Sequence, residues 1–340
     1  MLEQCLMDRI SRDISDGLIV LDMNGSISFI NPSAGKMLEV GDIRRSDNAV
    51  SVMQEDFKQD NDEFFQFLLN AVYERDKTHT GEVSFDTRQG HKKWFSVSTS
   101  FLYGEDGVTQ EGVLVRLVDI TDIRALRQKT YDSAFVFVLM MAGVCLWSFV
   151  YLIWKGLGAP IADTVMTKVV EFFGILAFYI LWKYTSITVR DMGLSVKGAG
   201  GYIRKDLLYT LAAAGILVVI KLVLLKLAPS LFARRVLVDF SGWDWSCTLY
   251  PVTVVTQEFL TRGVIHESVN RIMPGKYSDF WAILVSSLFF GALHIHKGIV
   301  FMVGAFILLS VFGLIYRKQK TIWGLCIPHY VLGLMVDLMF

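Results

Sequence analysis

Repeated apolar runs, each close to twenty residues long, occupy the chain from about Ser133 onward. A helix needs about twenty predominantly apolar residues to cross the hydrocarbon core of a bilayer. This part of the chain is therefore predicted to be an all-α polytopic membrane domain of about seven helices. The candidate spans are centred near residues 143, 175, 217, 258, 288, 306 and 331.

The overall composition agrees with a membrane domain joined to a soluble one. Of the 340 residues, 53% are hydrophobic and 19% are charged, and the mean hydropathy is +0.44, which is too apolar for a soluble enzyme of this length. The first 130 residues carry an ordinary soluble mixture, so the boundary falls near residue 130. The formal net charge is zero and no basic cluster is interleaved with aromatic residues, which argues against nucleic acid as a partner.

Lysine and arginine are unevenly distributed among the loops between the predicted spans. They gather before the first span and after the second, fourth and sixth spans, at Arg124, Arg127, Lys129, Lys183, Arg190, Lys197, Arg204, Lys205, Arg262, Arg271, Lys276, Arg317, Lys318 and Lys320. Loops rich in these residues stay on the cytoplasmic side. We therefore expect a multi-pass protein of the cytoplasmic (inner) membrane, embedded in the lipid bilayer, with its N-terminal part in the cytoplasm.

The soluble part begins with a strand, a turn and a second strand. Residues Leu18–Asp22 and Ser26–Ile30 are rich in β-forming residues and flank Asn24-Gly25. An Asn-Gly pair between two such runs predicts a β-hairpin. The following Asn31-Pro32 predicts the start of a helix, because Asn caps a first turn and Pro suits the first helical position.

Three further strands are expected at Gly81–Asp86, Lys92–Leu102 and Gly112–Val118, with a helix within Gln54–Lys77. The last strand leads into Asp119-Ile120-Thr121-Asp122. This order resembles a PAS domain, which is an α+β fold with an antiparallel sheet and flanking helices. In that family the final Asp-Ile-Thr joins the last strand to an exit helix that carries the signal.

The PAS resemblance covers residues 13–123, with residues 1–12 as a lead-in and residues 122–134 as a linker helix that leads into the membrane domain. It implies a sensor, and PAS domains often pair as homodimers. The cysteine-containing motif of flavin-adduct PAS domains is absent, and His79 and His91 fall in loop or strand-edge positions. We therefore expect a small ligand or none in the sensor, and neither haem nor a flavin adduct.

Three of the predicted spans hold polar groups that a helix facing lipid would not carry. Within each motif the key residues lie four positions apart, one helical turn, so they share a helix face. Ionisable side chains inside a membrane are functional candidates because they are costly there. The motifs are Gln257-Glu258-Phe-Leu-Thr-Arg262, Phe290-Gly-Ala-Leu-His294 and His329-Tyr-Val-Leu-Gly333.

The order and spacing of these motifs, together with Met192-Gly193-Leu194, resemble the CPBP family, which includes the type II CAAX prenyl endopeptidases. The resemblance covers residues 135–340. In that family a Glu and two His activate a water that attacks a peptide bond, and an Asn helps to stabilise the oxyanion. The resemblance therefore implies an intramembrane endopeptidase acting on a membrane protein or peptide. The corresponding catalytic positions are Gln257, Glu258, Arg262, His294 and His329, with Phe290 and Gly333 in support.

Two positions depart from the family pattern. Gln257 stands where the first, catalytic Glu is expected, and Gly333 stands where Asn or Asp is expected. An amide cannot accept a proton from water at neutral pH. Glu258 points about 100° away from Gln257 around a helix, and it is well placed for an ion pair with Arg262.

The sequence leaves two hypotheses open. One is a PAS-regulated protease in which His294 and His329, with Glu258, activate the water or hold a divalent metal such as zinc. The other is a catalytically inactive CPBP-fold module that binds a membrane partner and transmits the PAS signal. A transporter is disfavoured, because the paired Gly/Pro-broken helices of many transporters are absent.

Several other polar residues in the predicted membrane domain receive structural assignments. Glu171 and Lys221 are expected to pair near the outer side, because a lone charge in the membrane is costly. His296 is two residues from His294, hence on nearly the opposite face of a continuing helix. His266 and His296 are both expected to be peripheral.

Overall fold

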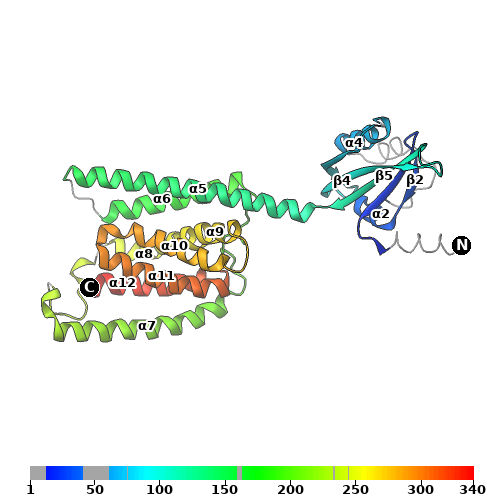
Figure 1. Ribbon diagram of the computed structural model, residues 1–340. Helices are drawn as coiled ribbons and strands as arrows, with labels where there is room; N and C mark the ends of the chain where they lie inside the picture. Colours follow the sequence, from blue (N-terminus) through cyan, green and yellow to red (C-terminus); the bar gives the residue numbers. More distant parts are fainter. Residues whose placement is uncertain (1–12, 41–60, 75, 159–162, 233, 244) are drawn as a thin grey trace. The chain divides into compact units, whose positions relative to one another are not determined.

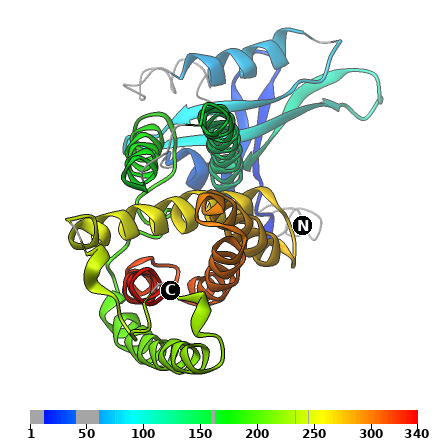
Figure 2. The same ribbon diagram turned by 90° about the vertical axis from the view of Figure 1, so that its left-hand side faces the viewer.

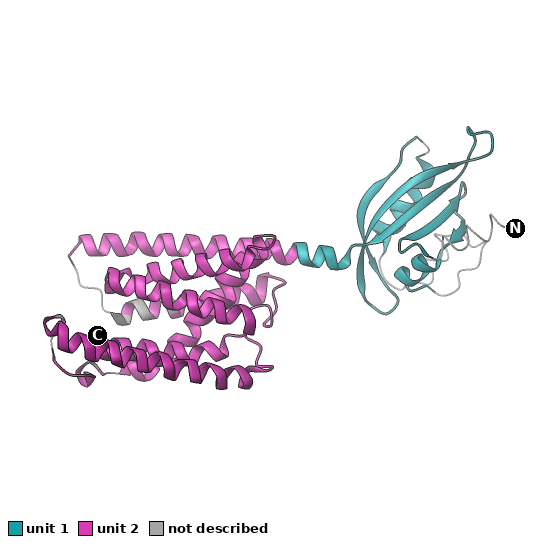
Figure 3. Cartoon of the chain, turned by 60° about the horizontal axis from the view of Figure 1, so that its bottom comes forward, with its two compact units in different colours: residues 1–127 teal, residues 128–340 magenta. Residues whose placement is uncertain are grey.

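The computed structural model describes residues 13–40 and 61–340, apart from residues 75, 159–162, 233 and 244. The chain forms two compact units, residues 1–127 and residues 128–340 (Figure 3). Each unit has a hydrophobic core of its own.

The N-terminal unit is built on a five-stranded antiparallel sheet with the strand order β2-β1-β5-β4-β3. Inward-facing and outward-facing residues alternate along β1, as expected for a strand with one face on the core. The strands are β1 Gly17–Asp22, β2 Ile27–Ile30, β3 Thr80–Asp86, β4 Lys92–Tyr103 and β5 Gln110–Asp119. The α+β fold with an antiparallel sheet is thus confirmed.

Among the described residues, the helices that flank this sheet are α2 Pro32–Leu38 and α4 Asp62–Tyr73 (Figure 1). The predicted cap of α2 is confirmed, since the Asn31 side chain accepts a hydrogen bond from the Ala34 amide at 2.9 Å. Helix α4 buries phenylalanine and leucine side chains against the sheet. The part of the predicted Gln54–Lys77 helix before residue 61 lies outside the described residues.

The last strand leads into a single long helix, α5, which covers Thr121–Gly156 and includes the predicted linker. Its first turn is fixed to the sheet, because the Thr121 hydroxyl accepts a hydrogen bond from the Trp94 amide at 3.0 Å. The Arg124 guanidinium lies 3.3 Å from the centre of the Trp94 ring and donates to Glu82 at 2.9 Å. The start of α5 is therefore part of the N-terminal unit.

The C-terminal unit is a bundle of helices, many of which run side by side (Figures 1 and 2). Helix α12 packs against α7 and α8, and α10 packs against α11. After α5 the elements are α6 Asp163–Tyr184, α7 Ala199–Leu227, α8 Trp245–Glu258, the π-helix η3 Phe259–His266, α9 Glu267–Ile272, α10 Ser278–Leu293, α11 Ile299–Gln319 and α12 Trp323–Met339.

Among the described residues, three helices are long and apolar enough to cross a membrane: α5, α7 and α11. Helices α10 and α12 are apolar but shorter. Large apolar side chains such as Phe149, Ile175 and Val300 are exposed on this unit, as expected for surfaces in contact with lipid. The chain is a membrane protein, and the number of seven spans stays a prediction.

The expected pair of Glu171 and Lys221 does not form. Glu171 accepts a hydrogen bond from the Thr253 hydroxyl at 3.0 Å and pairs with Lys168 at 2.7 Å. Lys221 donates instead to the Met339 carbonyl. The prediction was wrong because α6, which carries Glu171, packs against α8, whereas α7, which carries Lys221, packs against α12. Glu171 therefore contacts Thr253 of α8, and Lys221 contacts Met339 of α12.

Candidate active site

Glu258 and Arg262 lie where α8 changes into a π-helix. Glu258 is the last residue of α8, and all eight residues of η3, Phe259–His266, are buried. Arg262 Nε lies 3.7 Å from Glu258 Oε2, and neither side chain has any exposed surface. Arg262 also donates to the Ser286 hydroxyl at 3.1 Å and to the Leu309 carbonyl. Single-turn π-helices are rare and often mark functional sites.

His329 contacts the other oxygen of the same carboxylate. Its Nδ1 lies 2.6 Å from Glu258 Oε1, and its side chain is only 5% exposed. A carboxylate accepts hydrogen bonds, so neutral His329 carries its proton on Nδ1, and Nε2 is left with a free lone pair. Glu258, Arg262 and His329 therefore form one buried chain of charges and hydrogen bonds, and the free end of this chain is His329 Nε2.

His294 lies at the C-terminal end of α10, where Phe290 links the two histidines. His294 Nδ1 lies 2.9 Å from the Phe290 carbonyl. The Phe290 ring centre is 4.5 Å from that of His294 and 5.5 Å from that of His329. Phe290 therefore packs against both imidazole rings.

Five of the predicted site residues line one cavity of about 1260 Å³. They are Gln257, Phe290, His294, His329 and Gly333. Most of the remaining wall is apolar and comes from α5, α6, α7, α11 and α12. Gln257 Oε1 is buried and has no hydrogen-bond partner among the described residues. Glu258 and Arg262 are not in the wall and lie behind His329.

The geometry does not fit the metal site that the sequence left open. Within the described part of the chain, no three His, Cys, Asp or Glu side chains lie close enough to hold a metal ion. Glu258 and His329 form a direct pair, whereas Nδ1 of His294 faces the Phe290 carbonyl. The three proposed ligands therefore do not converge on one point, and no catalytic step is assigned to a metal.

The two histidines expected to be peripheral are both closer to the centre of the bundle. Helix α10 ends at Leu293 and a 3-10 turn follows, so the His296 ring lies beside that of His294, with 6.1 Å between the ring centres. A continuing helix would have placed it on the far side. His266 is fully buried, and its ring centre lies 5.1 Å from that of Tyr316.

Tyr250, Lys297 and Asp337 are among the cavity residues that the sequence analysis did not single out. Lys297 and Asp337 form an ion pair at 2.8 Å. Helical spacing offers a signal for two of them, because Tyr250 precedes Gln257 by seven residues and Asp337 follows His329 by eight, each close to two turns. A polar residue two turns from a motif shares its face.

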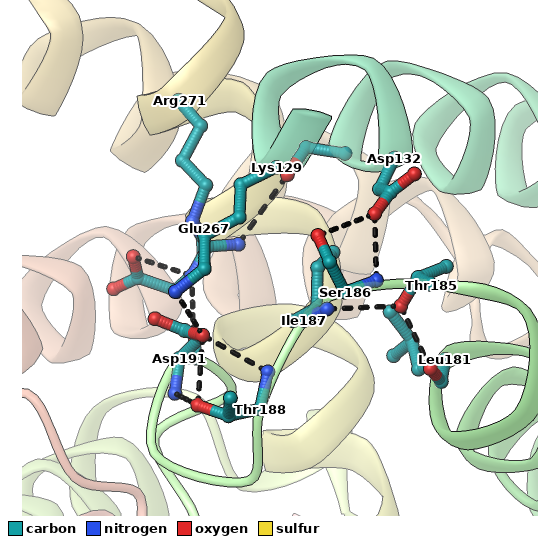
Figure 4. Close-up of polar contacts among 11 residues, drawn as sticks. Lys129, Asp132, Leu181, Thr185, Ser186, Ile187, Thr188, Asp191, Glu267 and Arg271 are labelled. Atoms are coloured by element: carbon teal, nitrogen blue, oxygen red, sulfur yellow. Dashed lines mark hydrogen bonds and ion pairs between the residues drawn. The ribbon is translucent and has the colours of Figure 1, made fainter. Parts of the chain in front are cut away.

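A second polar cluster ties the membrane-proximal part of α5 to the loop before α7 (Figure 4). Lys129 Nζ lies 2.8 Å from Asp191 Oδ2. Asp132 accepts hydrogen bonds from the Ser186 amide at 2.7 Å and from its hydroxyl at 2.6 Å. Partial burial by itself would raise the pKa of Asp191, but hydrogen bonds from Lys129 and Thr188 outweigh it and lower the pKa to about 2.

Arg271 connects this cluster to α9, the helix that follows η3. It donates to the Asp191 carbonyl and, at 3.4 Å, to the Ser133 hydroxyl of α5. Its guanidinium also lies 3.7 Å from Glu267, the first residue of α9 (Figure 4). Helix α9 directly follows η3, which directly follows Glu258. Arg271 therefore joins α5 to the stretch of chain that begins at Glu258.

Comparison with known families supports both resemblances. Residues 5–120 match the PAS fold family, and residues 241–335 match the family described as type II CAAX prenyl endopeptidase Rce1-like. The second match contains all three polar motifs. The chain thus joins a PAS segment to an Rce1-like CAAX protease segment, as the sequence predicted.

Solved PAS domains are among the structures similar to this chain. One, from a protein of Colwellia psychrerythraea, is 22% identical over 36% of this chain and 98% of that one, with a TM-score of 0.28. The PAS domain of an HTR-like protein from Haloarcula marismortui is 19% identical over 35% and 92%, with a TM-score of 0.26. That of nitrogen regulation protein NR(II) from Vibrio parahaemolyticus is 18% identical over 34% and 98%, with a TM-score of 0.26. None of the curated proteins matches this chain.

Proposed function

We propose that this protein is an inner-membrane endopeptidase that hydrolyses a peptide bond of a membrane-associated substrate and is controlled by its cytoplasmic PAS sensor. The observation that carries the proposal is the 2.6 Å contact between Glu258 Oε1 and His329 Nδ1, with His329 in the wall of the cavity. Pairing of two chains through their PAS domains is part of the same proposal.

The Glu258–His329 pair supplies the general base that Gln257 cannot provide. Glu258 holds the proton of His329 on Nδ1, so Nε2 accepts a proton from water as the water oxygen attacks the peptide carbonyl carbon. The positive charge that forms on the ring is stabilised by the Glu258 carboxylate, as Asp stabilises His in serine hydrolases. Arg262 places a positive charge 3.7 Å from the other oxygen of that carboxylate, in a buried site.

Completion of the reaction needs only the proton that His329 has taken. When the tetrahedral intermediate collapses, the carbon–nitrogen bond breaks and His329 Nε2 returns the proton to the leaving amine. The unpaired Gln257 Oε1 is available to accept a hydrogen bond from the attacking water and to orient it. His294 adds a second imidazole to the wall of the cavity.

The cluster around Asp191 supports control by the sensor. Helix α5 begins at the end of the PAS sheet and continues into the membrane-embedded unit without a break. Lys129 and Arg271 join its base to the loop before α7 and to α9. A rotation or shift of α5 would therefore displace α9 and, through η3, the end of α8 at Glu258. These contacts give the signal a contiguous physical route.

Cleavage by the purified full-length protein in detergent tests this function. Internally quenched apolar peptides and fluorescein-labelled casein are suitable general substrates. We expect wild type to cleave, and His329→Ala to lose activity by about 10²-fold or more because it removes the base. His91→Ala, a change at an exposed histidine of the sensor, is the matched control and should retain full activity.

An inactive signalling module is the second candidate, and the Gln257 and Gly333 departures favour it. In that case wild type would cleave nothing, and Gln257→Glu would create activity. In cells, His329→Ala would leave the phenotype intact while deletion of the PAS segment would abolish it. That combination would overturn the protease proposal.

A further inference from the structure

We propose that the hydroxyl of Tyr250 is the oxyanion-stabilising group of this site. The proposal rests on the protease function proposed above and adds a catalytic residue to it. Attack of water on a peptide carbonyl places negative charge on the carbonyl oxygen. A fixed hydrogen-bond donor close to that oxygen is usually a large part of catalysis.

The hydroxyl occupies the space that a side chain at position 333 would need. A Cβ atom built on Gly333 would fall on the Tyr250 hydroxyl oxygen, and two atoms of the Tyr250 ring would lie 3.1 and 3.2 Å from it. Glycine at this position therefore admits the hydroxyl to the surface of α12. A larger residue at position 333 would collide with Tyr250 where it now lies. Glycine at position 333 and tyrosine at position 250 are therefore complementary in size.

This position is close to the reacting groups. Gly333 follows His329 by four residues, one turn of α12, and Tyr250 precedes Gln257 by seven residues, two turns of α8. All four residues line the same cavity. The Tyr250 hydroxyl thus lies at Gly333, one turn of α12 from His329. It is therefore near a carbonyl group that is attacked by water held at His329.

Two other donors in the cavity wall already have partners. The Thr253 hydroxyl donates to Glu171 at 3.0 Å, and Lys297 donates to Asp337 at 2.8 Å. The Tyr250 ring packs against Tyr330, with 5.9 Å between ring centres, which limits its motion. A phenol is neutral near pH 7 and so carries the proton that an oxyanion accepts.

Removal of the hydroxyl alone is the first test. Tyr250→Phe should lower kcat by about 10²- to 10³-fold, the usual cost of one oxyanion donor, with KM little changed. Tyr330→Phe removes a hydroxyl from the stacked neighbour, which is not in the cavity wall, and should leave kcat unchanged. Equal activity of Tyr250→Phe and wild type would overturn the proposal while the protease function stands.

A reciprocal exchange separates catalysis from packing. Gly333→Asn alone should be inactive, because its side chain collides with Tyr250. The double variant Tyr250→Leu with Gly333→Asn makes room for the new amide donor, and its kcat should exceed that of Tyr250→Leu by at least tenfold. A residue that only packs would show no such rescue, so an unimproved double variant that is folded by thermal unfolding counts against the proposal.

A binding measurement keeps this inference separate from the protease function. Decylphosphonate, titrated calorimetrically into the protein in detergent, carries a tetrahedral anion on an apolar chain. Loss of the hydrogen bond to this charged group should weaken binding to Tyr250→Phe about tenfold or more, while Tyr330→Phe binds as wild type does. If no variant cleaves peptides but this difference holds, the protease function fails and the anion-binding role stands. If both variants bind equally, the role of Tyr250 is refuted.

Discussion

Glu258, Arg262 and His329 show how single residues set the chemistry of this site. The carboxylate divides its two oxygens between a permanent cation and a titratable ring, with Oε1 toward His329 and Oε2 toward Arg262. Helical spacing alone places Glu258 beside Arg262, but His329 is 71 residues away along the sequence. The proposed general base therefore depends on a long-range contact.

Loss of Arg262 should be costly for the fold. Arg262→Met leaves the Glu258 carboxylate buried without its cation, and we expect a destabilisation of about 3–5 kcal/mol, the usual cost of breaking a buried pair on one side. Thermal unfolding in detergent measures the change. Arg234→Met, which breaks an exposed pair with Asp239, should cost less than about 1 kcal/mol. Similar losses for the two variants would contradict the assignment.

Among the elements, the π-helix η3 is positioned by close backbone contact. Gly263 lies against the segment that precedes α7, and a Cβ built on it would approach the Met192 carbonyl oxygen to 2.5 Å. On that segment Gly193 has a φ of +68°, a conformation that favours glycine. The Ile322 amide at the start of α12 also donates to the Gly193 carbonyl at 3.0 Å. The Met192-Gly193-Leu194 segment thus connects η3 with α12, the two elements that carry Arg262 and His329.

A methyl group at Gly263 should disturb this junction. Gly263→Ala forces the backbone of η3 away from Met192, and we expect about 1–3 kcal/mol of destabilisation, as for overpacked interiors. Gly215→Ala is the matched control, since it lies within α7 with nothing within 4 Å of the new Cβ. That variant should be neutral or more stable by up to about 1 kcal/mol, because Ala favours helices. Equal thermal stability of the two variants would disprove the close contact.

In the whole molecule, α5 is the covalent link between sensor and membrane domain. Its first turn is bonded to the PAS sheet through Thr121 and Arg124, and its later turns are bonded to the bundle through Lys129 and Asp132. Each unit therefore holds its own end of the same helix. In the proposed function, this helix carries a signal from the sheet to the segment that contains the site.

The ion pair of Lys129 with Asp191 predicts a pH dependence for this link. The folded pKa of Asp191 is about 2, below the ordinary value of about 3.9, so its stabilisation is complete above about pH 4 and is lost as the pH falls toward 2. Asp191→Asn should therefore lower thermal stability near pH 6 and have a shrinking effect below pH 4. Asp239→Asn, at an exposed pair, should have a smaller effect. A deficit for Asp191→Asn that is constant from pH 6 to pH 2.5 would contradict the assignment.

Much of the fold could be predicted from local patterns. The β1–β2 hairpin, the Asn31 cap and the three later strands follow from turn residues and alternation, which act over a few residues. The site motifs were predicted because ionisable residues stand out in apolar helices. The actual partners of Glu171 and Lys221 were not predictable, because they depended on which helices are neighbours.

The sequence by itself determined the order of the two domains and the apolar helices, and it gave Gln257, Glu258, His294 and His329 as candidate site residues. Only the tertiary structure decided that Glu258 bonds His329, that the proposed metal ligands do not converge, and that Tyr250 occupies the space beside Gly333. The physical reason is that periodicity specifies which face of a helix a residue occupies, whereas the partner of that face depends on how distant helices pack.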